Sequence, residues 1–102
     1  MASFQDFYVP STTEGLTWRI GFHKPQGRPG VVCATEGECE VHDDVRIFRT
    51  VLYQSRHIRH QLSGRATLKA VTDAGRELLR QMEVNGYITS HDVRRYTPCL
   101  VK

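Results

Sequence analysis

The chain has few features that would place it in a membrane or outside the cell. Its 102 residues contain no apolar run near the roughly 18 residues that a membrane span needs. The first residues lack the basic-then-apolar pattern of a secretory signal. Three cysteines, Cys33, Cys39 and Cys99, are an odd number, which fits reduced thiols better than a disulfide framework. We therefore expect a cytoplasmic protein without membrane contact; the alternative, a Cys33–Cys39 bridge across a hairpin, would go with export.

The sequence also lacks the short motifs of common enzymes. It has no glycine-rich phosphate loop and no nucleophile elbow, and residues 27–30 are typical of a turn. Glu38 and Glu40 share a strand face and could form a carboxylate pair. Glutamates that face outward from an edge strand, however, more often prevent aggregation. We expect no enzymatic activity and no cofactor.

Candidate metal ligands are few. Cys33, Cys39, His42 and Cys99 form a Cys₃His set, and this chemistry suits structural zinc. Zinc sites usually show two close pairs of ligands, and here only Cys39 and His42 stand that close in sequence. Buried cysteines that pack as small apolar side chains are far commoner. We therefore predict no metal site.

Lysine is scarce, and the charge is divided unevenly along the chain. Eleven of the 14 basic residues are arginine. Residues 1–43 carry 3 basic and 6 acidic side chains, a net of −3, whereas residues 44–102 carry 11 and 5, a net of +6. No acidic residue occurs from position 45 to position 64. Because the guanidinium fork matches phosphate and carboxylate groups, this pattern indicates recognition more than solubility.

The N-terminal half predicts an arm followed by strands. Residues 1–15 hold several turn formers and are expected to be a loosely ordered arm, while 16–102 are expected to form one domain. Apolar and polar residues alternate over 16–22, which predicts a strand. Two shorter strands are expected at 31–34 and 38–42, with a turn at 35–37. Together the three would form an antiparallel meander.

The next segment predicts a helix that covers this sheet. When residues 45–62 are projected at about 100° each, their apolar side chains fall in one arc, and Asp43 and Asp44 could cap the helix. The same stretch is rich in β-branched and aromatic residues, so a fourth strand over 45–53 is the alternative.

A second helix is predicted over 68–82, with a stop at Asn85 and Gly86. A short strand at 87–88, a helical turn at 92–96 and a tail or edge strand at 99–101 would follow. The expected fold class is α+β: a three-stranded antiparallel sheet, covered on one face by an antiparallel helical hairpin, with a short C-terminal helical turn or strand.

The first expected helix supplies the main candidate binding site. Five side chains step along it by three and four residues and would form one stripe: Arg46, Arg49, Tyr53, Arg56 and His60. Such a stripe can follow a phosphate backbone, and the tyrosine could stack on a base. A charged helix face is also often merely solvated.

A second basic cluster lies near the C-terminus. Arg94 and Arg95 stand directly before Tyr96 in the sequence. Arg65 and Lys69, near the expected turn between the two helices, could join either cluster.

One stretch resembles part of a known family. Residues 64–79, Gly-Arg-Ala-Thr-Leu-Lys-Ala-Val-Thr-Asp-Ala-Gly-Arg-Glu-Leu-Leu, are similar to one piece of the MarR-type winged-helix repressors. In that family a basic wing strand runs into a helix that starts with leucine-threonine-x-x-glycine-arginine. The resemblance covers 16 of the 102 residues and implies DNA binding. Upstream the chain departs from the family, because it lacks the recognition helix and its glycine-leucine-valine exit.

These observations favour a small, non-enzymatic binding or regulatory protein. The first hypothesis is association with DNA or RNA through the arginine-rich helix face. The alternative is a protein–protein interaction module, an inhibitor or adaptor of the phage or mobile-element type. It would use the same arginine and tyrosine side chains on an acidic partner protein, since both residue types commonly anchor protein interfaces.

Overall fold

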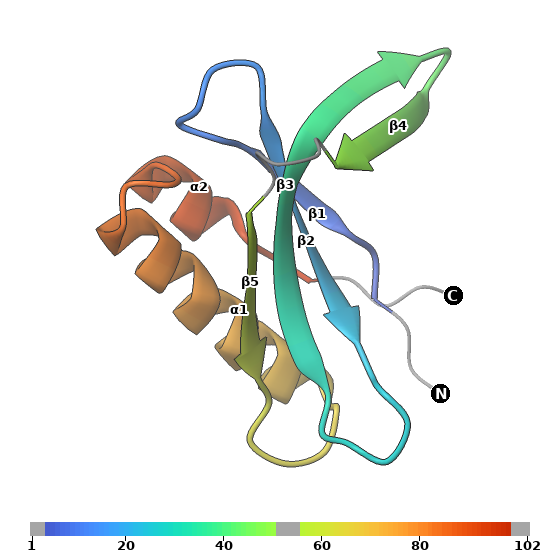
Figure 1. Ribbon diagram of the computed structural model, residues 1–102. Coiled ribbons are helices and arrows are strands. Elements are labelled where there is room, and N and C mark those ends of the chain that lie inside the picture. Colours follow the sequence, from blue (N-terminus) through green and yellow to red (C-terminus); the bar gives the residue numbers. More distant parts are fainter. Residues whose placement is uncertain (1–3, 51–55, 99–102) are drawn as a thin grey trace.

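The computed structural model describes residues 4–50 and 56–98, which form an α+β fold with an antiparallel sheet and two helices (Figure 1). The α+β class is therefore confirmed. The elements in chain order are β1 (Phe7–Pro10), β2 (Thr17–His23), β3 (Val31–His42), β4 (Val45–Thr50), β5 (His57–Gln61), α1 (Leu68–Val84) and α2 (Ser90–Arg95).

Strand β3 organises the sheet. It pairs with β2 along one edge, from Val31 to Gly37, and β2 pairs in turn with β1. Along its other edge, β3 pairs first with β5, over Val31–Thr35, and then with β4, over Gly37–His42. All pairs are antiparallel. Strands β4 and β5 therefore follow one another along a single edge of β3.

The two faces of the sheet have different surroundings. Both helices lie on one face, where Trp18, Ile20, Val32 and Ala34 are buried against α1 side chains such as Leu78 (Figure 1). No helix covers the other face in the part of the chain that the structure describes. Because side chains alternate between the faces of a strand, the odd-numbered residues of β2, β5 and the first half of β3 point to this open face.

The helix expected over 45–62 is not formed, so the three-stranded sheet and the helical hairpin were wrong in detail. The described part of this segment forms β4 and β5. The first of these agrees with the alternative prediction of a strand over 45–53. Asp43 and Asp44 do not cap a helix; both have positive φ, 48° and 64°, and form the two-residue turn between β3 and β4. Such turns need positive φ at both positions, which aspartate tolerates.

Residues 31–42 form one strand rather than two strands and a turn. Gly37 lies in its middle, and a Cβ there would overlap the backbone oxygen of Arg49. This glycine therefore lets β4 approach closely, and it does not mark a turn. The first 15 residues, expected as an arm, contribute β1, whose Val9 is fully buried.

The C-terminal half agrees better with the sequence. Helix α1 covers the predicted range and ends at Asn85 and Gly86, whose φ is 79°. The expected last helical turn is α2, which begins after Thr89. The short strand expected at 87–88 is not formed. The expected tail or edge strand at 99–101 lies outside the described residues.

A glycine in α1 lets α2 dock. Gly75 is buried, and a Cβ at this position would overlap the ring of Tyr96, which follows α2. The Tyr96 ring also meets Phe7 of β1 edge-on, with centroids 5.2 Å apart. Burial raises the pKa of the Tyr96 hydroxyl to about 12. The tyrosine thus joins α1, the C-terminal segment and β1.

We predict that Gly75→Ala destabilises the protein by about 1–2 kcal/mol. Overpacking a filled core costs about 1–3 kcal/mol, and the better helix propensity of alanine offsets at most about 1 kcal/mol. Urea denaturation would measure the difference, with Gln81→Ala on the exposed side of the same helix as the control. If Gly75→Ala were as stable as the wild type or more stable, the Tyr96 ring would not be packed against Gly75.

Candidate functional site

The structure divides the predicted stripe between the two faces of the sheet. Arg46, on β4, reaches the open face, whereas Arg49 faces the opposite way and pairs with Glu38 at 3.4 Å. His60 pairs with the core residue Val32 in register, so it faces the helices. Arg56 binds a buried carboxylate, and Tyr53 lies outside the described residues. The described members of the stripe do not share one surface, because the described parts of the segment form strands.

Arg56 forms the most buried ion pair among the described residues. Its Nε and Nη2 donate to the two carboxylate oxygens of Glu36 at 2.9 and 2.7 Å, and Glu36 is only 1% exposed. The guanidinium also lies 3.9 Å from the ring centre of Tyr87 and 5.2 Å from that of Trp18. The Ser11 hydroxyl donates to the same carboxylate at 2.6 Å. This network occupies Arg56 structurally.

The C-terminal cluster is divided as well. Arg95 donates to Asp92 at 3.1 Å and lies 5.1 Å from the ring centre of Phe7, so it helps to hold α2 against β1. Arg94 is exposed on the surface of α2. Neither side chain lies on the open face of the sheet.

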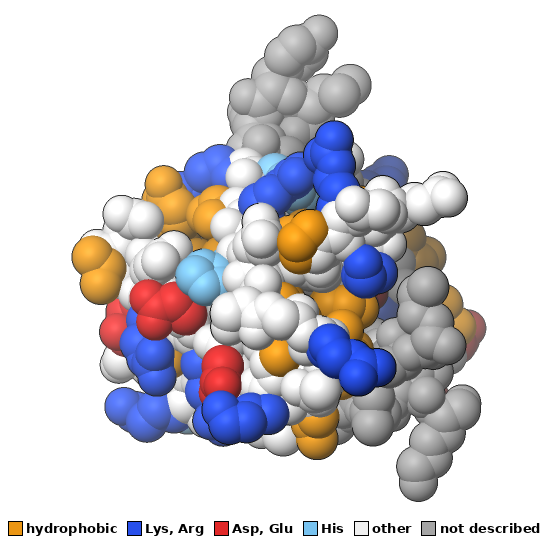
Figure 2. All heavy atoms as spheres, turned by 90° about the horizontal axis from the view of Figure 1, so that it is seen from below, with side chains coloured by type: hydrophobic (Ala, Val, Ile, Leu, Met, Phe, Trp, Pro, Cys, Tyr) orange, Lys and Arg blue, Asp and Glu red, His pale blue; other side chains and the backbone are white. Residues whose placement is uncertain are grey.

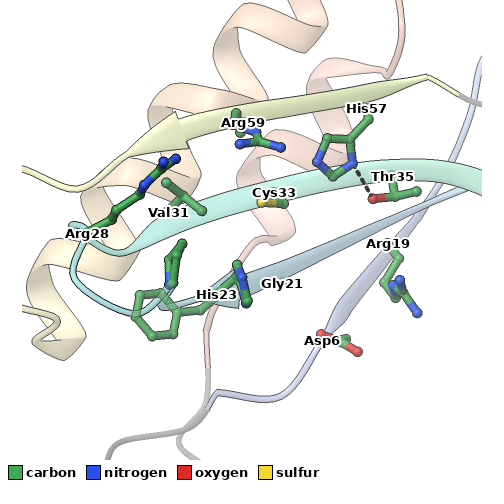
Figure 3. Close-up of a pocket in the computed structure, with 12 residues that line it drawn as sticks. Asp6, Arg19, Gly21, His23, Arg28, Val31, Cys33, Thr35, His57 and Arg59 are labelled. Atoms are coloured by element: carbon green, nitrogen blue, oxygen red, sulfur yellow. Dashed lines mark hydrogen bonds between the residues drawn. The ribbon is translucent and has the colours of Figure 1, made fainter.

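The open face contains a hollow of about 590 Å³ (Figure 3). Its floor is made of small side chains, because Gly21 of β2 pairs with Cys33 of β3, and Thr35 follows two residues later. Longer side chains surround the floor. Those labelled in Figure 3 come from β2, β5, the β2–β3 loop and the segment before β1, and they are Asp6, Arg19, His23, Arg28, His57 and Arg59.

One end of the open face is closed by alternating cations and rings. The Arg46 guanidinium lies 4.1 Å from the ring centre of Tyr8, and that of Arg19 lies 4.6 Å from the ring centre of Phe48. The two rings are 6.1 Å apart and tilted by 56°. These contacts show that the β3–β4 hairpin coils toward β1, so β1, β2 and β4 contribute to one surface.

The charge of this surface is mostly uncompensated. Arg19, Arg28, Arg46 and Arg59 form no ion pair with any described carboxylate, whereas Arg49, Arg56, Arg80 and Arg95 elsewhere each form one. Asp6 is the one acidic side chain in the lining of the hollow. Four arginines against one aspartate leave a net of +3 for the open face.

The one thiol that lines the hollow is not activated. Burial raises the pKa of the Cys33 thiol, and Arg59 only partly opposes this, so the thiol stays protonated near neutral pH. His57 Nδ1 lies 2.8 Å from the hydroxyl of Thr35 (Figure 3). No group of three or more His, Cys, Asp or Glu side chains in the described ranges could hold a metal ion. With three arginines in its lining, the hollow suits the binding of an anion.

Sequence reasoning missed most of this surface, including Arg19, Arg28 and Arg59. For Arg19 a signal was present, since the alternation over 16–22 placed it opposite the apolar side chains of the strand. Arg59 could be recognised only with β5 assigned as a strand. The small residues on the floor of the hollow could not be recognised from the sequence, because glycine and cysteine occur in strands for many structural reasons.

No model of a known protein family matches the chain, and neither a curated protein nor a solved structure is similar enough to count as a match. The stretch that resembles winged-helix repressors forms the β5–α1 loop and the first part of α1, and strands rather than a helix precede it. None of the described helices is long and apolar enough to cross a membrane.

Arg49 and Arg56, two of the three predicted site residues that form ion pairs, should differ sharply in their effect on stability. Arg56→Ala would leave Glu36 buried without its cation, which costs about 3 kcal/mol. Arg49→Ala removes an exposed pair, and such pairs contribute under about 1 kcal/mol. Urea denaturation of both variants would measure this. Equal effects would contradict the structural role of Arg56.

The Glu36 network also predicts a loss of stability in acid. Burial alone would raise the pKa of the Glu36 carboxyl, but hydrogen bonds from Arg56 and Ser11 outweigh it and hold the pKa below its ordinary value of 4.5. The unfolded chain therefore takes up the proton first as the pH falls, and the contribution of ionised Glu36 is lost below about pH 4.5. Between pH 7 and pH 3 the free energy of unfolding, measured by urea denaturation, should fall less in Glu36→Gln than in the wild type. Ser11→Ala should show an intermediate fall. An unchanged fall in Glu36→Gln would refute this.

Proposed function

We propose that this chain is a non-enzymatic binding protein that holds single-stranded nucleic acid on the open face of its sheet. The observation that supports this most is the set of arginines on that face, none of which pairs with a described carboxylate. A buried or paired arginine is already satisfied, whereas an unpaired guanidinium can donate two parallel hydrogen bonds to a phosphate. The proposed site therefore lies on the open face of the sheet and not on the predicted helix. The group that it would bind, phosphate, is the one that the sequence predicts.

The spacing of the arginines favours a polymer over a single phosphate. Arg19 stands opposite Thr35 and Arg59 opposite Cys33, so they are two residues apart along the strands and two strands apart across them. This is roughly 7 Å by 10 Å between backbone positions. Arg28 and Arg19 lie at opposite ends of the hollow (Figure 3). Cations so distributed can bind separate phosphates of one strand.

The rings on the same face favour a single strand over a duplex. Unpaired bases stack on aromatic rings and on arginine guanidinium planes, and each such stack contributes about 1–3 kcal/mol. Tyr8 and Phe48 with Arg46 and Arg19 supply both kinds of surface. In a duplex the base faces are already covered by neighbouring bases, so these rings would have no partner.

The hairpin tip supports a second candidate, a protein partner. Val41, Val45 and Ile47 are 63%, 60% and 43% exposed, and they lie on the part of β3 and β4 that extends beyond the rest of the sheet. Apolar side chains in such a position are typical of protein contacts. An acidic protein could then meet the neighbouring arginines, which is the inhibitor or adaptor alternative.

Fluorescence anisotropy would test the proposed function. We expect a labelled 12-nucleotide single strand to bind more tightly than a duplex of the same length, with a log–log salt slope near −3, about −0.7 for each of four arginines. Arg19→Gln combined with Arg59→Gln should weaken binding at least tenfold. The control, Arg49→Gln combined with Arg80→Gln, loses the same charge away from the open face and should bind normally.

The outcome separates the two candidates. Thermal melting would first establish that both double variants are folded. If the wild type binds no oligonucleotide at low salt, the nucleic-acid proposal fails. An acidic protein partner for the same face is then the remaining candidate. If the control variant loses as much affinity as the open-face variant, binding depends on net charge alone and not on this surface.

A further inference from the structure

Two other hollows adjoin the one on the open face. A smaller one, of about 280 Å³, shares Arg28 and Arg59 with it. A groove of about 650 Å³ shares Arg28 and Gln61 with the smaller hollow. The three together lead from the open face, past the end of β5, to the lower end of the molecule as drawn in Figure 1.

Two loops form the walls of this groove. One is the β2–β3 loop, residues 24–30, and the other is the β5–α1 loop, residues 62–67; they lie side by side at the lower end (Figure 1). The amide of Leu62 donates to the carbonyl of Gly30 at 2.9 Å, and the ammonium of Lys24 donates to the carbonyl of Arg28. The first bond joins the two loops, and the second lies within the β2–β3 loop.

The groove is basic and has no acidic side chain in its lining. Lys24, Arg28 and Arg65 contribute its charge, and none of them forms an ion pair with a carboxylate of the described chain. Seen from below, this end shows blue lysine and arginine groups spread over its surface with hydrophobic atoms between them, and red acidic groups on the left side of the view (Figure 2). The ammonium of Lys24 keeps two further N–H donors after its bond to Arg28.

We propose that a bound single strand does not end on the open face but continues past Arg28 into this groove, where Lys24 and Arg65 bind its phosphates. This inference rests on the proposed function and extends it, since it assigns a second segment of the binding site and a minimum length of ligand. The physical reason is adjacency: beyond Arg59 and Arg28, a chain of phosphates meets the next unpaired cations of the described chain in the groove, whose lining also includes Arg28. Counterion release then adds the groove contacts to those of the open face.

A length series separates the groove from the open face. The probes are labelled (dT)4 and (dT)12, with (rU)4 and (rU)12 as a parallel set that reports any preference for ribose. The test variant is Lys24→Gln combined with Arg65→Gln. The control is Arg76→Gln combined with Arg94→Gln, which removes two exposed cations from the helices. Thermal melting establishes that both variants are folded.

The expected result is a loss that depends on length. The groove variant should bind the 4-mer as the wild type does, within about twofold, and the 12-mer about tenfold more weakly. For the 12-mer the salt slope should become less steep by about 1.4, which is about 0.7 for each of two lost contacts. The control variant should change neither affinity nor slope.

Three results would overturn the inference. If the groove variant keeps the wild-type affinity and slope for the 12-mer, the strand does not enter the groove, although the proposed function stands. If the 4-mer and the 12-mer weaken equally, or if the control weakens as much, the effect is one of overall charge. If no oligonucleotide binds the wild type at low salt, the proposed function and this extension fail together.

Discussion

The ion pair between Glu36 and Arg56 is the interaction on which the sheet depends. Glu36 stands where β3 exchanges one partner strand for the other, β5 before it and β4 after it. Its amide donates to the carbonyl of Arg56 at 2.9 Å, while its side chain accepts from the Arg56 guanidinium. A carboxylate that is 1% exposed is costly unless paired, so the two chain segments are fixed to one another at this point.

The same pair explains why arginines on the two faces have different roles. The Nε and Nη2 groups of Arg56 already donate to a carboxylate, and its guanidinium lies against the rings of Trp18 and Tyr87, so this fork of donors is not free for a phosphate. Once it is fixed, alternation along β5 places Arg59 on the opposite face, where no acid neutralises it. A basic sequence segment is thus divided by strand geometry into a structural arginine and a free one. Net charge alone does not distinguish them.

The sequence predicts those parts of the fold that neighbouring residues decide, and not those that depend on residues far apart in the chain. Helix α1 was predictable because its apolar period and its stop at Asn85 and Gly86 are local. The apolar residues of 45–62 fit an arc on a helix as well as they fit strands, and only pairing with β3 decides between them. The continuous β3 was hidden for the same reason, since Glu36 can be buried only because Arg56, 20 residues away, neutralises it.

The candidate site was predictable in chemistry but not in position. The excess of arginine pointed to phosphate or carboxylate groups, and Arg46 does reach the open face. Arg49 and Arg56 instead pair with glutamates that precede them by 11 and 20 positions. Arg19 and Arg59 come together only because β2 and β5 flank β3, a pairing that no local pattern in the sequence encodes.

The two sides of the hollow also differ in charge, because its one acidic residue, Asp6, lies on the β1 side. A Cβ at Gly21 would overlap the Asp6 carboxylate, so this glycine leaves the space that the carboxylate occupies on the β1 side. The unpaired cation of Arg59 lies across β3 from it, on β5 (Figure 3). Phosphates are repelled from the first side and attracted to the second, whereas the amino groups of bases can donate to a carboxylate. In the proposed complex, the part of the strand that passes Asp6 would therefore keep its backbone toward β5, the side on which the basic groove opens.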